Sequence, residues 1–284
     1  MTASFDYLLD DLEALWDKGL EPSKKDLEEF GENVKKAVVA SLTRSNTEEG
    51  EREVVRMSSI GKPLRQLWYS NREKEKSDTE KFSYSTLLKF LYGSIIEELL
   101  ILLVKTSGHS VTDQQEEHNV KGVLGHSDGR IDGVLVDFKS ASGRSLLKFK
   151  NQTLFFDDPF GYLAQISGYA EKKKDSRAAF VVLDKQSGEI AVMNIDRNQM
   201  MDVNKRIDDV RNALAKDTPP DLCYWDEEDG KSGNRKLSVG CSYCSHKIKC
   251  WPNLRAFKYA NGTRYLTVVE REPNVEEVFI EQTQ

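Results

Sequence analysis

An Asp132-Gly133 pair between two segments of alternating polar and apolar residues is the feature that most constrains the fold of this chain. Asp-Gly is typical of the two central residues of a type I′ turn, so the segments on either side should pair as an antiparallel hairpin. A turn centred on this pair places Asp128 opposite Asp137 and His126 opposite Lys139.

Because strand side chains alternate, Asp137 and Lys139 share one face of this hairpin. The intervening residues should point the other way, into a core: Val134, Val136 and Phe138. Carboxylates that face each other, as Asp128 and Asp137 would, repel unless a cation lies between them. Mg²⁺ prefers oxygen ligands and polarises phosphate oxygens, so the pattern points to phosphodiester hydrolysis, with Lys139 orienting the attacking water. The alternative is a surface hairpin with scattered charges.

Hydrophobic periodicity and turn residues predict the other elements. These are helices over 5–16, 24–42, 83–107, 160–174 and 196–216, strands over 178–184 and 189–195, and a last hairpin around Asn261-Gly262. The helix from Ser83 to Gly108 is so apolar that it should be mostly buried. The sequence thus predicts an α/β (α+β) fold with a small mixed sheet flanked by helices. Three parts are expected: a helical region over 1–82, a core over 83–216, and a cysteine module with the last hairpin over 217–284.

Two helical pairs add polar groups at one-turn spacing. Gly93 and Glu97 share a helix face, so the missing side chain of Gly93 leaves space beside a carboxylate among apolar neighbours. A buried acid of this kind needs a partner. Gln165 and Tyr169 repeat the spacing, although such a pair is often plain surface packing.

The net charge of −6 is unevenly distributed. Residues 1–60 hold fourteen acids and eight bases, which accounts for the whole excess. The segment from Lys231 to Arg264 contains eight Lys and Arg residues and no acid, so it can hold a polyanion despite the overall sign. A solvated basic loop is the alternative.

These pieces, in this order, resemble the PD-(D/E)XK nucleases. The motifs are G-x-x-x-E (93–97), GHSDG (125–129), DFK (137–139) and Q-x-x-x-Y (165–169). The sequence is most similar to the RecB-type branch, which includes the nuclease domains of RecB and AddB, CRISPR-adaptation exonucleases and phage recombination exonucleases. The resemblance covers about residues 54–255 and implies a restriction-endonuclease-like core.

The resemblance also implies roles for individual residues. The metal ligands would be Asp128, Asp137, Glu97 and the carbonyl of Phe138, and the catalytic residues would be Glu97, Asp128, Asp137, Lys139 and Gln165. Tyr169 would support the site or contact DNA. In the segment RMSSIGKPLRQLWY (56–69), similar to the lead-in of this branch, Arg65 is a candidate phosphate contact.

All four cysteines lie in the last quarter of the chain, at Cys223, Cys241, Cys244 and Cys250. The C-x2-C pair and its neighbours suit one metal ion or cluster better than disulfides. The segment GCSYCSHKIKCWP resembles the C-terminal motif of the iron-sulfur members of the RecB-type branch, which implies a 4Fe-4S cluster. Those relatives place their first cysteine before the nuclease motifs, where this chain has Pro63-Leu64-Arg65, so Cys223 would have to substitute. A Zn²⁺ site, with four cysteines or with His246, is the alternative.

Together these features predict a Mg²⁺- or Mn²⁺-dependent DNA exonuclease that acts at duplex ends and single strands in recombination, repair or replication. DNA contacts are expected from the basic cysteine module, at Lys247, Lys249 and Arg255. A recombinase or single-strand-binding protein is a further expected partner. The alternatives are a structure-specific or restriction-like endonuclease and a non-catalytic nucleic-acid-binding adaptor.

No membrane partner is expected from the sequence. The longest apolar run, Leu99–Val104, is far shorter than the roughly 18 residues of a spanning helix. The acidic start lacks the basic region of a signal peptide. The expected location is the cytoplasm, or the host cytoplasm for a phage-encoded protein.

Overall fold

The computed structural model describes residues 3–43, 55–74 and 84–280, which form two compact units. We call them the sheet unit and the cysteine unit. The sheet unit comprises Met1–Gly61, Ser77–Asp158 and Tyr162–Ile207, and the cysteine unit comprises Lys62–Lys76, Pro159–Gly161 and Asp208–Gln284. The three-part division expected from the sequence remains a prediction.

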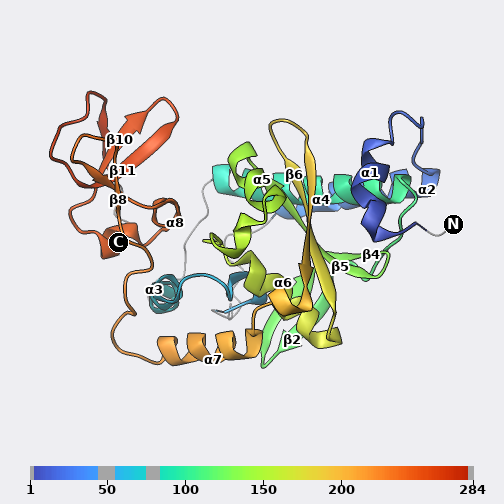
Figure 1. The fold of residues 1–284 in the computed structure, drawn as a ribbon, viewed down its shortest axis with the longest axis horizontal. Helices are drawn as coiled ribbons and strands as arrows, with labels where there is room; N and C mark the ends of the chain where they lie inside the picture. Colours follow the sequence, from blue (N-terminus) through green and yellow to red (C-terminus); the bar gives the residue numbers. More distant parts are fainter. Residues whose placement is uncertain (1–2, 44–54, 75–83, 281–284) are drawn as a thin grey trace. The chain divides into compact units, whose positions relative to one another are not determined.

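The sheet unit begins with helices, continues with a run of short strands, and then combines further helices and strands (Figure 1). Its helices are η1 (Phe5–Tyr7), α1 (Leu8–Glu13), α2 (Lys24–Thr43), η2 (Met57–Ser59), α4 (Tyr84–Thr106), α5 (Gly143–Lys150), η3 (Thr153–Phe155), α6 (Tyr162–Lys173) and η4 (Arg197–Gln199). Its strands are β1 (Val111–Thr112), β2 (Glu116–Val120), β3 (Val123–Ser127), β4 (Gly129–Ile131), β5 (Val134–Ala141), β6 (Arg177–Asp184) and β7 (Ile190–Asp196). The boundary between the units falls within α7 (Val203–Leu214).

Five of these strands form one mixed sheet in the order β1-β4-β5-β6-β7. Strands β5 and β6 are parallel, and the other neighbours are antiparallel. Helices α5 and α6 lie in the crossover between the parallel strands, as such a connection requires. The predicted class, a mixed α/β fold with helices around a small mixed sheet, is confirmed.

The register of the central hairpin is confirmed near the turn. Gly129, Arg130 and Ile131 pair with Val136, Leu135 and Val134. Asp132 and Gly133 both have positive φ angles, of 49° and 85°, as a type I′ turn requires. The ladder includes no residue before Gly129, however, because β4 begins there and Asp128 lies outside this sheet.

The predicted pairing of His126 with Lys139 is wrong. Strand β3 pairs instead with β2 in a separate two-stranded sheet, where His126 lies opposite Glu117. The turn of this second hairpin is Lys121-Gly122, with φ angles of 49° and 82°. A positive φ is uncommon for a residue with a side chain such as Lys121, so a Lys-Gly pair is a weak turn signal in a sequence.

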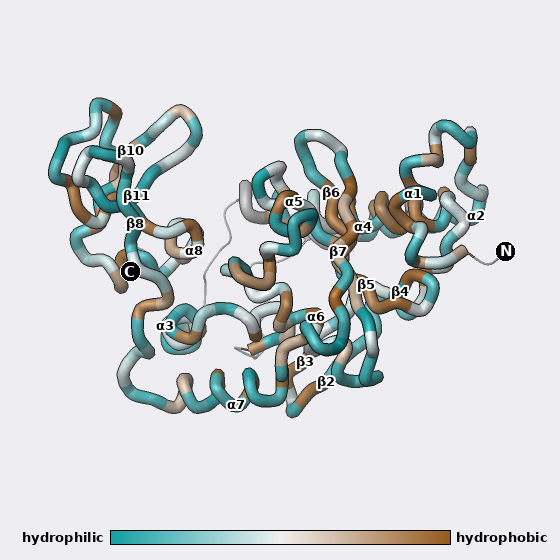
Figure 2. Tube along the Cα trace, viewed as in Figure 1, coloured by the Kyte–Doolittle hydropathy of each residue, from teal (hydrophilic) through white to brown (hydrophobic). Residues whose placement is uncertain are grey.

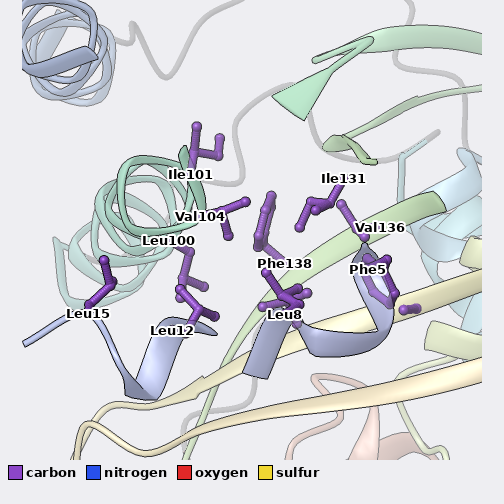
Figure 3. Close-up of a cluster of buried hydrophobic side chains, with 12 residues drawn as sticks. Phe5, Leu8, Leu12, Leu15, Leu100, Ile101, Val104, Ile131, Val136 and Phe138 are labelled. Carbon is purple, nitrogen blue, oxygen red and sulfur yellow. The ribbon is translucent and has the colours of Figure 1, made fainter. Parts of the chain in front are cut away.

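The two faces of the sheet carry different chemistry. The face of Val136 and Phe138 packs against η1, α1 and α4 in a buried apolar cluster, where Leu8 lies beside Phe138 (Figure 3). Brown, apolar stretches of the tube follow the strands, α1 and α4 (Figure 2). The opposite face carries Asp137, whose neighbour in β6 is Phe180. Helix α5 covers this face, because its Phe149 packs edge-on against Phe180. The predicted alternation along β5 is therefore confirmed.

Helix α4 begins and ends where the sequence predicts, with Gly108 at a φ of 95° just past its end. The expectation that it is mostly buried is wrong for its first half, where Leu88 is 40% exposed. Only the second half, from Leu100 to Val104, enters the core. A side chain at Gly93 would meet no described atom within 4 Å, so this glycine does not clear space for Glu97.

Two helix starts follow from capping groups. The amide of Asp26 donates to Ser23 Oγ at 3.1 Å, which confirms Ser23 as the cap of α2. Helix α7 begins later than predicted because β7 continues through Asp196, and the amide of Lys205 donates to the carboxylate of Asp202 at 2.9 Å. Within the described ranges, no helix is long and apolar enough to cross a membrane.

The cysteine unit is a second small sheet with short helices. Its helices are α3 (Leu64–Lys74), α8 (Val239–Ser242) and α9 (Lys247–Cys250), and its strands are β8 (Glu227–Glu228), β9 (Arg235–Lys236), β10 (Arg255–Tyr259), β11 (Gly262–Val268) and β12 (Glu277–Val278). The strand order is β12-β10-β11-β9-β8. The last hairpin turns at residues 260–261, one position earlier than predicted, because Tyr259 pairs with Gly262.

The two halves of α4 should respond differently to truncation. Leu100→Ala should lower the free energy of unfolding by about 2–5 kcal/mol, since Leu100 is fully buried and its removal leaves a cavity. Leu88→Ala, on the same helix, should cost much less because much of Leu88 already contacts water. Urea unfolding followed by circular dichroism measures both, and equal losses would contradict this division of the helix.

Candidate active site

Asp137 lies in the middle of β5, the central strand of the five-stranded sheet, and is completely buried. Its Oδ1 accepts no hydrogen bond from any residue in the described ranges. Lys139 Nζ lies 2.5 Å from Asp137 Oδ2, as an ion pair. Burying a carboxylate in this way is costly, so its position points to a function rather than to stability.

Lys139 is held between a carboxylate and an aromatic ring. Its Nζ lies 5.1 Å from the ring centre of Tyr162, the first residue of α6. Burial favours the neutral amine, but the negative charges of Asp137 and Asp128 raise the pKa of Lys139 above its ordinary value. Lys139 is therefore a positioned, charged hydrogen-bond donor. The sequence did not reveal Tyr162, because only the tertiary fold brings this ring to Lys139.

Asp128 follows β3 at the point where the chain changes sheets. The amide of Phe138 donates to Asp128 Oδ2 at 2.7 Å, so a side chain takes the place of the next ladder partner. Burial, followed by the negative charges of Asp137 and Glu97, raises the pKa of Asp128 well above its ordinary value. The carboxylates of Asp128 and Asp137 thus lie close enough to repel, although their residues are not ladder partners.

Glu97 reaches the same region from α4. Burial, followed by the negative charges of Glu98 and Asp137, raises its pKa to about 7. Its Oε1 accepts a hydrogen bond from Gln115 Nε2 at 3.1 Å. Three carboxyl groups from separate elements therefore act on one another electrostatically around a single lysine.

The charges of this group fit a divalent cation. If Glu97, Asp128 and Asp137 are all ionised, Lys139 balances only one of three negative charges, and a divalent ion would balance the other two. In the conformation described, Asp137 turns toward Lys139 and Asp128 toward the Phe138 amide. Among the described residues, no three His, Cys, Asp or Glu side chains stand in a geometry that holds a metal ion. The observation that favours a cation here is Asp137 Oδ1, which is buried and accepts no hydrogen bond from the described residues.

Gln165 and Tyr169 form a bonded pair on α6, with Gln165 Nε2 3.1 Å from the Tyr169 hydroxyl oxygen. Tyr169 is only 2% exposed, and burial raises its pKa to about 12. Its buried ring favours a supporting role over a DNA contact. Gly125 makes room for it, because a side chain there would meet the Tyr169 ring at 2.9 Å.

A buried histidine completes the surroundings of this tyrosine. The His118 ring lies 5.0 Å from that of Tyr169, and His118 Nε2 lies 2.9 Å from Ser127 Oγ. Burial lowers the pKa of His118, which favours the neutral ring. Since Ser127 directly precedes Asp128, this contact fixes the chain where Asp128 leaves β3. The sequence analysis missed His118 because it missed β2.

In the cysteine unit, Cys223, Cys241, Cys244 and Cys250 line one cavity of about 20 Å³. Burial raises the pKa of the Cys223 and Cys241 thiols, and it raises that of Cys244 to about 11. Without a metal these thiols are therefore protonated at neutral pH. The fold brings Cys223 to the other three despite the long loop between them.

Arg65 and His246 are already engaged within the cysteine unit. Arg65 donates to Cys250 Sγ at 3.2 Å, to the Pro220 carbonyl at 2.5 Å and to the Tyr69 hydroxyl at 3.3 Å. His246 places Nε2 2.9 Å from Ser70 Oγ and Nδ1 3.1 Å from a Glu73 carboxylate oxygen. Both ring nitrogens are thus occupied, which weighs against the zinc alternative that uses His246. The phosphate role of Arg65 remains a prediction.

The three basic residues expected to hold DNA have partners of their own. Lys249 forms an ion pair with Glu73, and Arg255 bonds to both Glu272 and Glu277. Lys247 lies 5.0 Å from the ring centre of Tyr265, and burial lowers its pKa. Their roles as DNA contacts remain predictions, and the paired acids reduce the charge that two of them offer.

Comparison with known proteins gives weak similarities only. No family model matches the chain, and no curated protein matches it. Among solved structures, that of SSO0001 is 15% identical with a TM-score of 0.42, covering 76% of this chain and 93% of its own. The alkaline exonuclease LHK-Exo from Laribacter hongkongensis is 13% identical, with a TM-score of 0.36 and coverage of 53% of this chain and 79% of its own. The structure of LHK-Exo in complex with dAMP is 13% identical, with a TM-score of 0.35 and coverage of 56% of this chain and 89% of its own. TM-scores below 0.5 do not establish a shared family.

The carboxyl group of Glu97 should make the metal-free protein less stable as pH rises. Between its ordinary pKa of 4.5 and its folded pKa of about 7, the folded state keeps a proton that the unfolded state has released. The free energy of unfolding therefore falls across this window. Glu97→Gln should remove up to about 3 kcal/mol of that fall.

Urea unfolding in EDTA at a series of pH values from 4 to 8 measures this difference. Glu28→Gln is the matched control, because the Glu28 side chain is 70% exposed on α2. Equal pH dependences for Glu97→Gln and the wild type would contradict the burial of this carboxyl group.

Proposed function

We propose that this protein is a metal-dependent deoxyribonuclease that hydrolyses phosphodiester bonds at DNA ends. The observation that carries the proposal is the buried Asp137 carboxylate, whose Oδ1 accepts no hydrogen bond from the described residues. Lys139 lies beside it, and Asp128 and Glu97 add their charges from other elements. This combination suits chemistry at a phosphate better than it suits stability.

The chain's own groups would hold the cation. Asp137, Asp128 and Glu97 offer carboxylate oxygens, and the Phe138 carbonyl is the fourth ligand of the proposal; hard oxygen donors of this kind suit Mg²⁺ or Mn²⁺. When bound, such an ion supplies a Lewis acid that polarises a phosphate oxygen and makes nearby water more acidic.

Lys139 has the role of orienting water and stabilising charge. Its ammonium group donates hydrogen bonds to the attacking water and to the phosphate oxygen on which negative charge grows. Asp137 and Tyr162 hold the ammonium in place from two sides. Hydrolysis consumes one water and leaves one phosphate monoester and one hydroxyl group.

The adaptor alternative loses support from this geometry. A non-catalytic protein would have no reason to bring Asp128, Asp137 and Lys139 together, yet Lys139 pairs with Asp137 and both carboxylates act on it. Cleavage of linear and of covalently closed circular DNA distinguishes an exonuclease from an endonuclease. A recombinase or single-strand-binding protein as a further partner remains a prediction.

End-labelled linear duplex should be degraded in Mg²⁺ and left intact in EDTA. Lys139→Ala and Asp137→Asn should each lower the rate by at least about 100-fold, because each removes a group that stabilises the transition state. DNA affinity in EDTA should change little. Lys185→Ala is the matched control, since Lys185 is an exposed lysine at the end of β6.

Retained cleavage by Lys139→Ala would contradict the assignment of this lysine. Cleavage of covalently closed circular DNA would favour the endonuclease alternative, whereas circular DNA that stays intact supports action at ends.

We also propose a 4Fe-4S cluster at the four cysteines, with Zn²⁺ as the alternative. Support comes from the small cavity that all four cysteines line. The thiols would release their protons as they become thiolate ligands, and the metal would tie the loop of Cys223 to α8 and α9.

Protein purified without oxygen should be brown, with broad absorption at about 400 nm, if the centre is iron-sulfur. A Cys₄ zinc centre would instead give colourless protein with about one zinc per chain. Cys241→Ser should lose the metal and lower the melting temperature, whereas Ser245→Ala, an exposed neighbour, should do neither. Purified wild-type protein that contains no metal would contradict the proposal.

A further inference from the structure

The segment after α5 presents an almost fully exposed aromatic ring. Phe156 is 92% exposed, in the stretch 151–158 that we call the η3 segment. A single exposed ring is ordinary by itself, so its meaning depends on what surrounds it.

The η3 segment is held in place at several points. Leu154 is buried, and the amides of Phe156 and Asp157 donate to the Thr153 carbonyl at 3.0 and 3.1 Å. Lys148 Nζ lies 2.5 Å from an Asp157 carboxylate oxygen. The ring of Phe156 therefore stands out from a braced turn rather than from a loose loop.

This segment is anchored beside the proposed catalytic residues. Phe149, at the end of α5, stacks on Tyr162 with the ring centres 6.3 Å apart, and Tyr162 lies next to Lys139. From the other end, the Asp158 carboxylate accepts hydrogen bonds from the amides of Tyr162 and Leu163 at 3.0 and 2.8 Å. Phe156 thus belongs to the sheet face that carries Asp137 and Lys139.

Helix α5, which directly precedes the η3 segment, carries an unpaired cation. Arg144 lies on α5 five residues after Lys139, is exposed, and has no ion-pair partner among the described residues. Its neighbours on the helix differ, because Lys148 pairs with Asp157 and Lys150 pairs with Glu189. Leu147, one turn from Arg144, is 52% exposed.

An unpaired cation on α5 and an exposed aromatic ring on the η3 segment that follows match the two parts of a single-stranded nucleic acid. Phosphates attract the guanidinium group, and unpaired bases stack on aromatic rings whatever their sequence. An apolar protein partner would cover Leu147 and Phe156 but would gain nothing from an unpaired Arg144 on the same helix as Leu147.

We propose that Phe156 stacks on an unpaired base near the end of a DNA strand while Arg144 binds a phosphate of that strand. The inference rests on the proposed function for its substrate class, and it adds which part of the surface holds the strand. The η3 segment then fixes the terminus beside Asp137 and Lys139, and ends with unpaired bases bind better than blunt ends.

The test measures binding without cleavage, in the full-length Lys139→Ala protein with Mg²⁺ present. The probes are two labelled duplexes with short single-stranded overhangs, identical except that one carries abasic sites in the overhang. Removing the bases should weaken binding about tenfold when Phe156 is present and less than about twofold in Phe156→Ala. Phe156→Trp should restore the difference.

A matched control and a second variant separate stacking from general effects. Trp16→Ala removes a ring that is 73% exposed near α1, which packs on the opposite face of the sheet, and should leave the base dependence intact. Arg144→Gln should reduce the slope of log affinity against log salt by about 0.7, the value for one phosphate contact on a single strand.

An unchanged base dependence in Phe156→Ala would overturn the inference. So would a change in sedimentation from dimer to monomer with DNA binding unaffected, because the ring would then cover a second copy of the chain. Wild-type protein that binds overhangs through Phe156 but cuts no DNA would overturn the nuclease proposal and leave this surface standing. If the wild type cleaves DNA but Phe156→Ala does not change binding, this inference is overturned and the nuclease proposal stands.

Discussion

The burial of an ionised carboxylate on the central strand is the constraint on which the rest of the sheet unit depends. Asp137 is completely buried, and apart from the Lys139 ammonium no described residue donates a hydrogen bond to its carboxylate, so nearby positive charge has to balance it. Lys139 supplies one positive charge, and the Tyr162 ring holds that lysine in place. Asp128 and Glu97 bring carboxyl groups from two further elements, and under the proposed function a divalent cation would balance their charge.

Local signals predicted much of the fold. The Asp132-Gly133 turn gave the register of β4 and β5, and the apolar run that ends before Gly108 gave the limits of α4. Neither signal extends beyond its own element. The chain changes sheets at Asp128, where the Phe138 amide donates to the Asp128 side chain instead of to a strand partner. Hydrophobic periodicity does not predict such a change of sheet. The exposed first half of α4 was missed for a related reason, since composition does not say what a helix packs against.

The same division holds for the site. Strand alternation placed Asp137 and Lys139 together, and helical spacing placed Gln165 beside Tyr169. Tyr162 and His118 were missed because their contacts join elements that are distant in the sequence. The internal bonds that engage basic residues of the cysteine unit are invisible to a count of charges for the same reason. The Lys121-Gly122 turn is the one local signal that could have revealed β2, and with it His118.

The most direct test of the central claim is to measure Mn²⁺ binding to the wild-type protein without DNA, by calorimetry and by electron paramagnetic resonance. The account predicts bound Mn²⁺ that is displaced by Mg²⁺, and predicts that Asp137→Asn abolishes it while the metal content of the cysteine unit stays unchanged. Wild-type protein that binds no Mn²⁺, or an Asp137→Asn variant that binds it equally well, would contradict the claim that this buried carboxylate exists to hold a cation.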